Sequence, residues 1–91
     1  MIEKEPVNEL VDEWVSRFEA IRDGLSSGTM SFAKATRLQD GLGSEMKHVL
    51  EENDRMSEFS TSHFERIALV VLECAQIAIQ SLLKDALGES K

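Results

Sequence analysis

The chain has few of the residues that interrupt helices or build sheets. It contains one proline, five glycines, no tyrosine and one tryptophan among its 91 residues. Alternating β-branched residues and hairpin turns, the usual signals of a sheet, are too scarce for one to form. We therefore expect a helical fold.

Cysteine and histidine are also scarce. The single cysteine, Cys74, cannot form an internal disulfide, which favours a reducing, cytoplasmic setting. It lies among apolar residues, where a thiol is expected to be buried and unreactive. His48 and His63 have no evident nucleophile to activate, and we predict no catalytic triad and no enzyme activity.

Basic residues are outnumbered by acidic ones, 10 to 17, and the net charge is −7. This balance argues against direct binding to nucleic acid or to an anionic membrane, because both require basic patches. No stretch approaches 18 uninterrupted apolar residues, and the first nine residues do not resemble a signal peptide. We expect no membrane span.

The most informative stretch is residues 62–87, SHFERIALVVLECAQIAIQSLLKDAL, which we predict to be one long helix. At 100° per residue, its polar side chains share about a quarter of the circumference. Those side chains are Arg66, Glu73, Gln76, Gln80 and Lys84. The remaining surface is apolar, so this helix has to be covered on two or three sides.

Two further helices are predicted, at about 6–26 and 32–53, from apolar residues at helical spacing. Glu13 and Arg17 form a favourable pair in the first of them. Gly28 is expected to end that helix, and Thr29 or Ser31 to cap the next. Because the connection is short, the second helix should run antiparallel to the first.

Local features of the second and third helices lead to further predictions. Gly41 and Gly43 lie in the middle of the second helix, where they indicate a tolerated weakness, a close backbone approach, or a break that divides the helix. Ser62 and Glu65 match a capping box at the start of the third helix, and Gly88 is expected to end it. Residues 1–5 and 89–91 are predicted to be polar termini.

Together these features predict an all-α fold in a single domain, residues 1–91. We expect an antiparallel helical bundle of three main helices, or four if the second helix breaks at Gly41 and Gly43. Because two one-sided helices cover only part of the third, oligomerisation is expected to complete the bundle.

No constellation of chemistry-bearing residues meets its structural requirements. Glu45 and His48 have the E-x-x-H spacing of di-iron bundles, but both lie off the predicted apolar face. We therefore predict no metal site and no cofactor. Glu73 is the one charged residue inside the long apolar stretch. It is either part of a solvated face or a contact that sets the register between helices.

Function is predicted from the surplus apolar surface. We place a protein interface on a flank of the third helix, formed by Leu69, Leu72, Ile79, Leu83 and Leu87. The chain would then be an interaction module without catalysis, such as an adaptor, a small chaperone, an immunity or antitoxin-like inhibitor, or a small subunit. Its partner would be another protein or a second copy. The alternative is an acidic decoy that mimics nucleic acid and blocks a basic surface.

Overall fold

The computed structural model describes residues 6–89, with the side chain of Glu89 left out. The predicted all-α fold is confirmed, and the described residues contain no strand. The helices are α1 (Val7–Ser27), α2 (Phe32–Lys47) and α3 (Thr61–Glu89). A π-helical turn, η1 (His48–Glu52), and a 3-10 turn, η2 (Met56–Glu58), connect α2 to α3. Of the termini predicted at 1–5 and 89–91, only Glu89 is among the described residues, and it belongs to α3.

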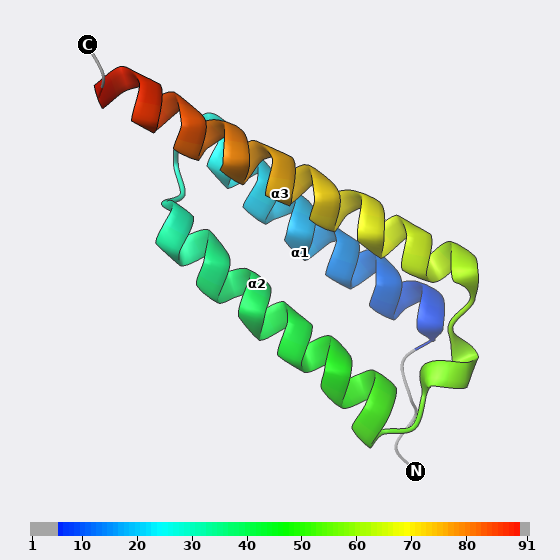
Figure 1. The fold of residues 1–91 in the computed structure, drawn as a ribbon. Coiled ribbons are helices and arrows are strands. Elements are labelled where there is room, and N and C mark those ends of the chain that lie inside the picture. The colour runs from blue at the N-terminus through cyan, green and yellow to red at the C-terminus, as the bar shows by residue number, and fades with distance from the viewer. Residues whose placement is uncertain (1–5, 90–91) are drawn as a thin grey trace.

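The three helices alternate in direction. α1 and α3 run the same way along their shared length, and α2 runs the opposite way (Figure 1). α1 packs extensively on α3 and less extensively on α2, whereas α2 and α3 barely touch. The molecule is therefore open along the side between α2 and α3.

The core is centred on α1. Six of its side chains are buried, against four of α3 and two of α2. They are Leu10, Val11, Trp14, Phe18, Ile21 and Leu25 of α1, with Ile67, Val70, Cys74 and Ala78 of α3 and Ala35 and Leu42 of α2. The long apolar helix is thus covered by one neighbour along one face, and α1 lies between its two neighbours.

The connection from α1 to α2 follows the predicted local signals. Gly28 adopts the left-handed conformation with φ of 78°, and Ser31 accepts a 3.1 Å hydrogen bond from the Lys34 backbone N–H. The backbone N–H groups of Thr29 and Met30 both donate to the Gly24 carbonyl. A Cβ atom at Gly24 would lie 2.9 Å from the Cβ of Met30, so the turn requires a glycine there as well.

α2 is continuous through Gly41 and Gly43, so the predicted break does not occur. A Cβ atom at either glycine would meet open space, which also rules out a close approach by another part of the described chain. The helix predicted over 32–53 is observed as an α-helix from Phe32 to Lys47, followed by a π-helical turn from His48 to Glu52. Asp54 then closes it in the left-handed conformation, with φ of 54°.

The start of α3 differs from the predicted capping box at Ser62. Ser60 is the cap. Its Oγ accepts a 3.3 Å hydrogen bond from the backbone N–H of His63, and the Nδ1 of the His63 ring accepts a 3.0 Å hydrogen bond from the Ser60 backbone N–H. Phe59, just outside the cap, stacks on Trp14 and packs against Phe64. This aromatic contact across the cap is a hydrophobic staple.

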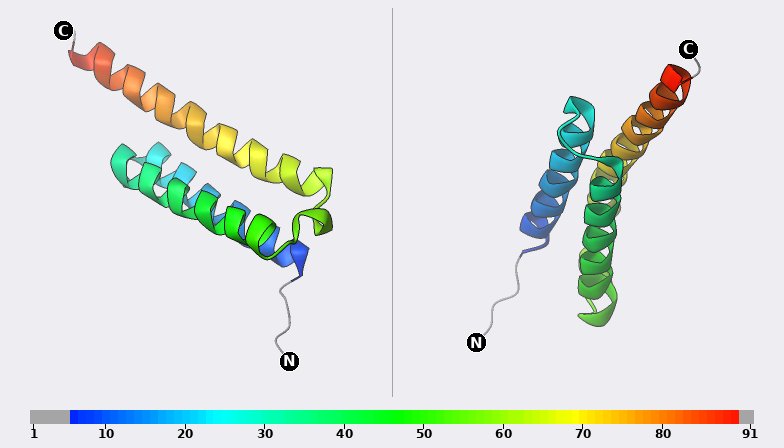
Figure 2. Two further views of the ribbon diagram at one scale, coloured as in Figure 1. Left: turned by 60° about the horizontal axis from the view of Figure 1, so that its bottom comes forward. Right: turned by 90° about the vertical axis from the view of Figure 1, so that its left-hand side faces the viewer.

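The end of α3 also differs from prediction. The helix continues through Gly88 to Glu89, and Gly88 has no positive φ. Its C-terminal part extends past the ends of α1 and α2 (Figure 2).

The whole molecule is elongated, with principal extents of 61 × 23 × 19 Å. Its radius of gyration is 15.6 Å, compared with about 12 Å expected for a compact domain of this length. Its accessible surface is 6500 Å², compared with about 5,300 Å² typical of a monomeric protein of 10.2 kDa. Both values, taken over the chain as a whole, are those of an elongated molecule and not of a compact one.

Candidate interaction surface

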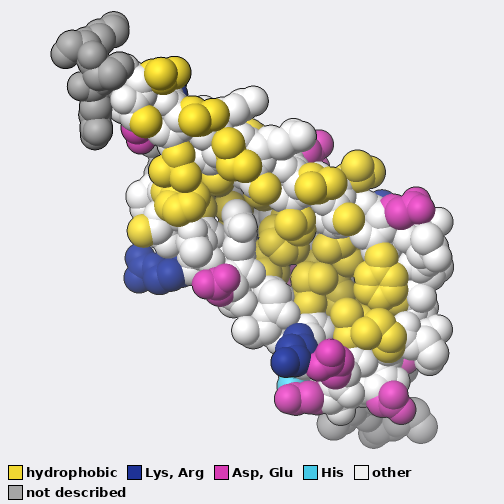
Figure 3. Space-filling view, in the orientation of Figure 1, with side chains coloured by type: hydrophobic (Ala, Val, Ile, Leu, Met, Phe, Trp, Pro, Cys, Tyr) yellow, Lys and Arg dark blue, Asp and Glu magenta, His cyan; other side chains and the backbone are white. Residues whose placement is uncertain are grey.

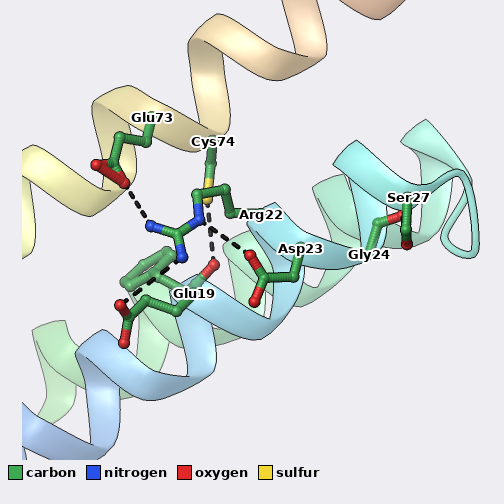
Figure 4. Close-up of polar contacts among 8 residues, drawn as sticks. Glu19, Arg22, Asp23, Gly24, Ser27, Glu73 and Cys74 are labelled. Carbon is green, nitrogen blue, oxygen red and sulfur yellow. Dashed lines mark hydrogen bonds and ion pairs between the residues drawn. The ribbon is translucent and has the colours of Figure 1, made fainter.

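The inner face of α3 is joined to α1 by polar contacts at its edges. Arg66 forms an ion pair with Asp12 at 2.8 Å, and the Nε2 of His63 contacts Asn8 Oδ1 at 2.8 Å. Arg22 forms an ion pair with Glu73 at 2.6 Å (Figure 4). These contacts set how α3 is rotated about its axis, and they leave its opposite face outward.

Glu73 therefore makes a contact between helices, which was one of the two roles predicted for it. The Glu73 side chain is half exposed at the edge of the interface between α1 and α3. The side of it that faces away from Arg22 is therefore solvated, which was the other predicted role. The hydrogen bond from Arg22 to Glu73 raises the pKa of Arg22, with a further contribution from Asp23. Glu19 lies 3.8 Å from the same guanidinium (Figure 4).

Cys74 is fully buried between α3 and α1. Its Sγ donates to the Phe18 carbonyl at 3.3 Å, as the dashed line in Figure 4 shows. Burial raises the pKa of the thiol above its ordinary value of 9.0. A buried protonated thiol is a poor nucleophile, so the position agrees with the packed, unreactive role predicted for it.

Glu45 attaches α2 to α1. The buried indole of Trp14 donates to Glu45 at 3.2 Å, and Arg17 donates to the same oxygen at 2.6 Å. His48, three residues later, contacts Glu52 on its own helix. Glu45 and His48, the two residues of the E-x-x-H pair, thus bind different partners. Within residues 6–89, no three His, Cys, Asp or Glu residues are grouped to hold a metal ion.

The structure gives His63 a serine neighbour that the sequence reasoning missed. Ser60 and His63 lie within 3.0 Å, and Asn8 lies on the other ring nitrogen. Because His63 Nδ1 accepts from the Ser60 backbone N–H, the ring proton resides on Nε2 and points to Asn8. The serine oxygen also accepts the capping hydrogen bond from the His63 backbone N–H, so this group stabilises the start of α3.

The five residues of the predicted interface all lie exposed along α3. Leu69, Leu72, Ile79, Leu83 and Leu87 have exposed fractions between 56% and 70%. Apolar side chains extend along α3 and into the space between α3 and α2 (Figure 3). Together they form a row of large, exposed apolar side chains on one helix.

A hollow of about 250 Å³ lies between α2 and α3, with α1 at its base. Its lining includes Phe32 and Ala35 of α2, together with Ala75, Ile79 and Leu82 of α3. Phe32 and Leu82 are large, half-exposed side chains that the sequence analysis did not place in the interface. They are exposed because α2 and α3 are separated on this side of the molecule.

α3 also passes a test of length and composition for crossing a membrane. Among the described residues one helix does so, over Thr61–Gly88, with a mean hydropathy of 1.7 and 17% of its most apolar window buried. The sequence analysis predicted no membrane span because no stretch of the chain approaches 18 uninterrupted apolar residues. A core helix of a soluble protein passes the same test, and Glu73 lies near the middle of this one.

Comparison with known proteins supplies no further assignment. No protein-family model, curated protein or solved structure matches the chain.

Proposed function

We propose that the chain is a small helical module for protein–protein recognition that acts without catalysis. The observation that carries this proposal is the exposed apolar face of α3, which includes Leu72 and Ile79. In this proposal the helices form an open bundle that another chain completes. Burial of one such side chain contributes roughly 1.5–3 kcal/mol, so a few of them suffice for a stable complex.

A lipid surface is a less suitable occupant of this face. Glu73 lies in the middle of α3 and is held in an ion pair with Arg22 of α1. A net charge of −7 also opposes approach to anionic lipid headgroups. These two features support a protein as the partner.

The acidic decoy receives less support from the contacts of α1. Three of the acids on its outer face are paired with arginines of the same chain: Asp12 with Arg66, Glu13 with Arg17 and Glu19 with Arg22. A phosphate mimic needs carboxylates that are available to a basic partner. The pairing reduces the negative potential of this face.

The test is affinity purification of the tagged protein from its native extract at about 1 M salt, where exposed ion pairs are screened. The double variant Leu72→Glu/Ile79→Glu places two charges on the α3 face. Met56→Glu is the matched control, because Met56 is an exposed apolar side chain on η2. We expect the wild type and the control to retain a stoichiometric partner or a second copy, and the double variant to lose it.

Circular dichroism first shows that each variant is folded. Equal recovery of the complex with the double variant would disprove an interface on α3. A complex that dissociates in salt and is unaffected by the double variant would instead favour the acidic decoy. A wild type that stays monomeric and unbound, and partitions into lipid vesicles, would disprove a protein partner.

A further inference from the structure

Six exposed residues of α3 form a regular heptad pattern on the side facing the open space beside α2. They are Ala68, Leu72, Ala75, Ile79, Leu82 and Ala86, separated by four, three, four, three and four residues. We call this set the α3 seam. Its direction lies about a third of a turn from the buried face of α3, at 100° per residue. Such spacing is the pattern by which two helices pack knobs into holes.

The α3 seam is distinct from the contact with α1 that α3 already makes. The residues facing α1 are Ile67, Val70, Cys74 and Ala78, and all four are buried. Three seam residues, Ala75, Ile79 and Leu82, line the hollow between α2 and α3. An additional helix placed on the seam would therefore fill this hollow and also contact α2.

The seam is complementary to itself when a second copy is reversed. Rotation about an axis between Ala75 and Ile79 places Ala75 opposite Ile79 and Leu72 opposite Leu82, and it matches the two ends, Ala68 and Ala86. Small residues then face large ones at the centre, which allows close helix packing. The same rotation brings Gln76 near its own copy and Leu69 near Leu83. No charged residue belongs to the seam.

The uncovered area also fits a second copy. The chain exposes about 1,200 Å² more than a compact monomer of its mass. A standard interface removes about 800 Å² from each partner, so the surplus is enough for one face of a stable dimer. An isologous pair uses the same surface on both chains and requires no second protein.

We propose that the α3 seam is a homodimer contact, in which α3 of a second copy lies antiparallel and fills the hollow beside α2. This inference rests on the proposed role of α3 as an interface and identifies its occupant. Each copy carries a charge of −7, so like charges oppose association. Salt therefore tightens the dimer by screening this repulsion.

The first experiment measures native mass by sedimentation across protein and salt concentrations. We expect two chains per particle, tighter association at higher salt, and dimer affinity reduced at least about a hundredfold by Ile79→Glu, because the substitution occurs twice across the axis. Met56→Glu is the control and should retain the wild-type mass. A mass of one chain at every concentration would overturn the homodimer, and the purification described above would still test a different partner.

The second experiment determines orientation and leaves the apolar seam in place. Ala68→Cys and Ala86→Cys are mixed under mild oxidation, with Cys74 buried away from the reaction. In an antiparallel dimer the mixture forms a disulfide between the two different variants, and Ala68→Cys alone remains uncrosslinked. A rapid crosslink by Ala68→Cys alone would establish a parallel pair and overturn the proposed arrangement. Absence of any crosslink in a protein that is dimeric would place the contact away from the seam.

Discussion

Two serines compete for the start of α3, and the residue before each one decides between them. Ser62 has a glutamate three positions later, the standard capping-box partner, whereas Ser60 has His63. Ser60 is used because it leaves Phe59 just outside the helix, with ring centroids 5.6 Å from Trp14 and 5.7 Å from Phe64. The aromatic contacts thus select the cap, and the one with Trp14 comes from α1, about 45 residues earlier in the chain.

This assignment predicts opposite behaviour for two neighbouring serines. Ser60→Ala removes the oxygen that accepts from His63 N–H and should lower the free energy of unfolding by about 1 kcal/mol. Ser62→Ala, inside the first turn, should change it by less than about 0.5 kcal/mol. Urea unfolding followed by circular dichroism measures both. A larger loss for Ser62→Ala would restore the sequence-based cap.

Among the helices, α1 takes the central place that the sequence analysis gave to α3. The apolar circumference of α3 indicated that two or three of its sides need a packing partner. It did not indicate that only one of these sides is packed against another helix of the described chain. α1 contacts both neighbours: its Trp14 donates to Glu45 of α2 and stacks on Phe59, which precedes α3. α2 contributes two buried side chains, and its Glu45 accepts hydrogen bonds from Trp14 and Arg17 of α1.

The glycines of the helices should respond differently to substitution by alanine. Gly41→Ala and Gly43→Ala add a methyl group in open space and should each stabilise the fold by about 0.5–1 kcal/mol, because alanine restricts the unfolded chain and favours a helix. Gly24→Ala should destabilise it, since the new Cβ would lie 2.9 Å from that of Met30. Thermal unfolding at fixed protein concentration compares the three. Destabilisation by all three would mean that another surface closely covers the middle of α2.

For the molecule as a whole, the buried contacts are distributed unevenly among the three helices. α1 and α3 share most of the buried side chains and their edge ion pairs, whereas α2 contacts α1 over a smaller area and leaves one side open. Regions with few buried contacts open at lower free energy than the rest of a fold. The chain therefore has one firm helix pair and a third helix attached to it.

Hydrogen exchange should reveal this difference. Backbone amides in the middle of α2 are expected to exchange at least about tenfold faster than those of α1 between Val11 and Ile21, at a protein concentration low enough to separate any dimer. Raising the concentration should then slow exchange in α2 if a second copy fills the hollow beside it. Equal protection of α1 and α2 in the monomer would show that the three helices open as one unit.

The sequence by itself determined that there are three helices, the turn at Gly28 and the burial of Cys74, and it narrowed the cap of α2 to Thr29 or Ser31. These follow from local spacing and from backbone preferences that neighbouring residues alone impose. The tertiary structure decided which helix is central, which serine caps α3, and that Glu45 and Glu73 join helices. It also exposed Phe32 and Leu82 beside the predicted leucines. Periodicity states how much apolar surface must be covered, whereas only the three-dimensional arrangement shows which part of it remains open.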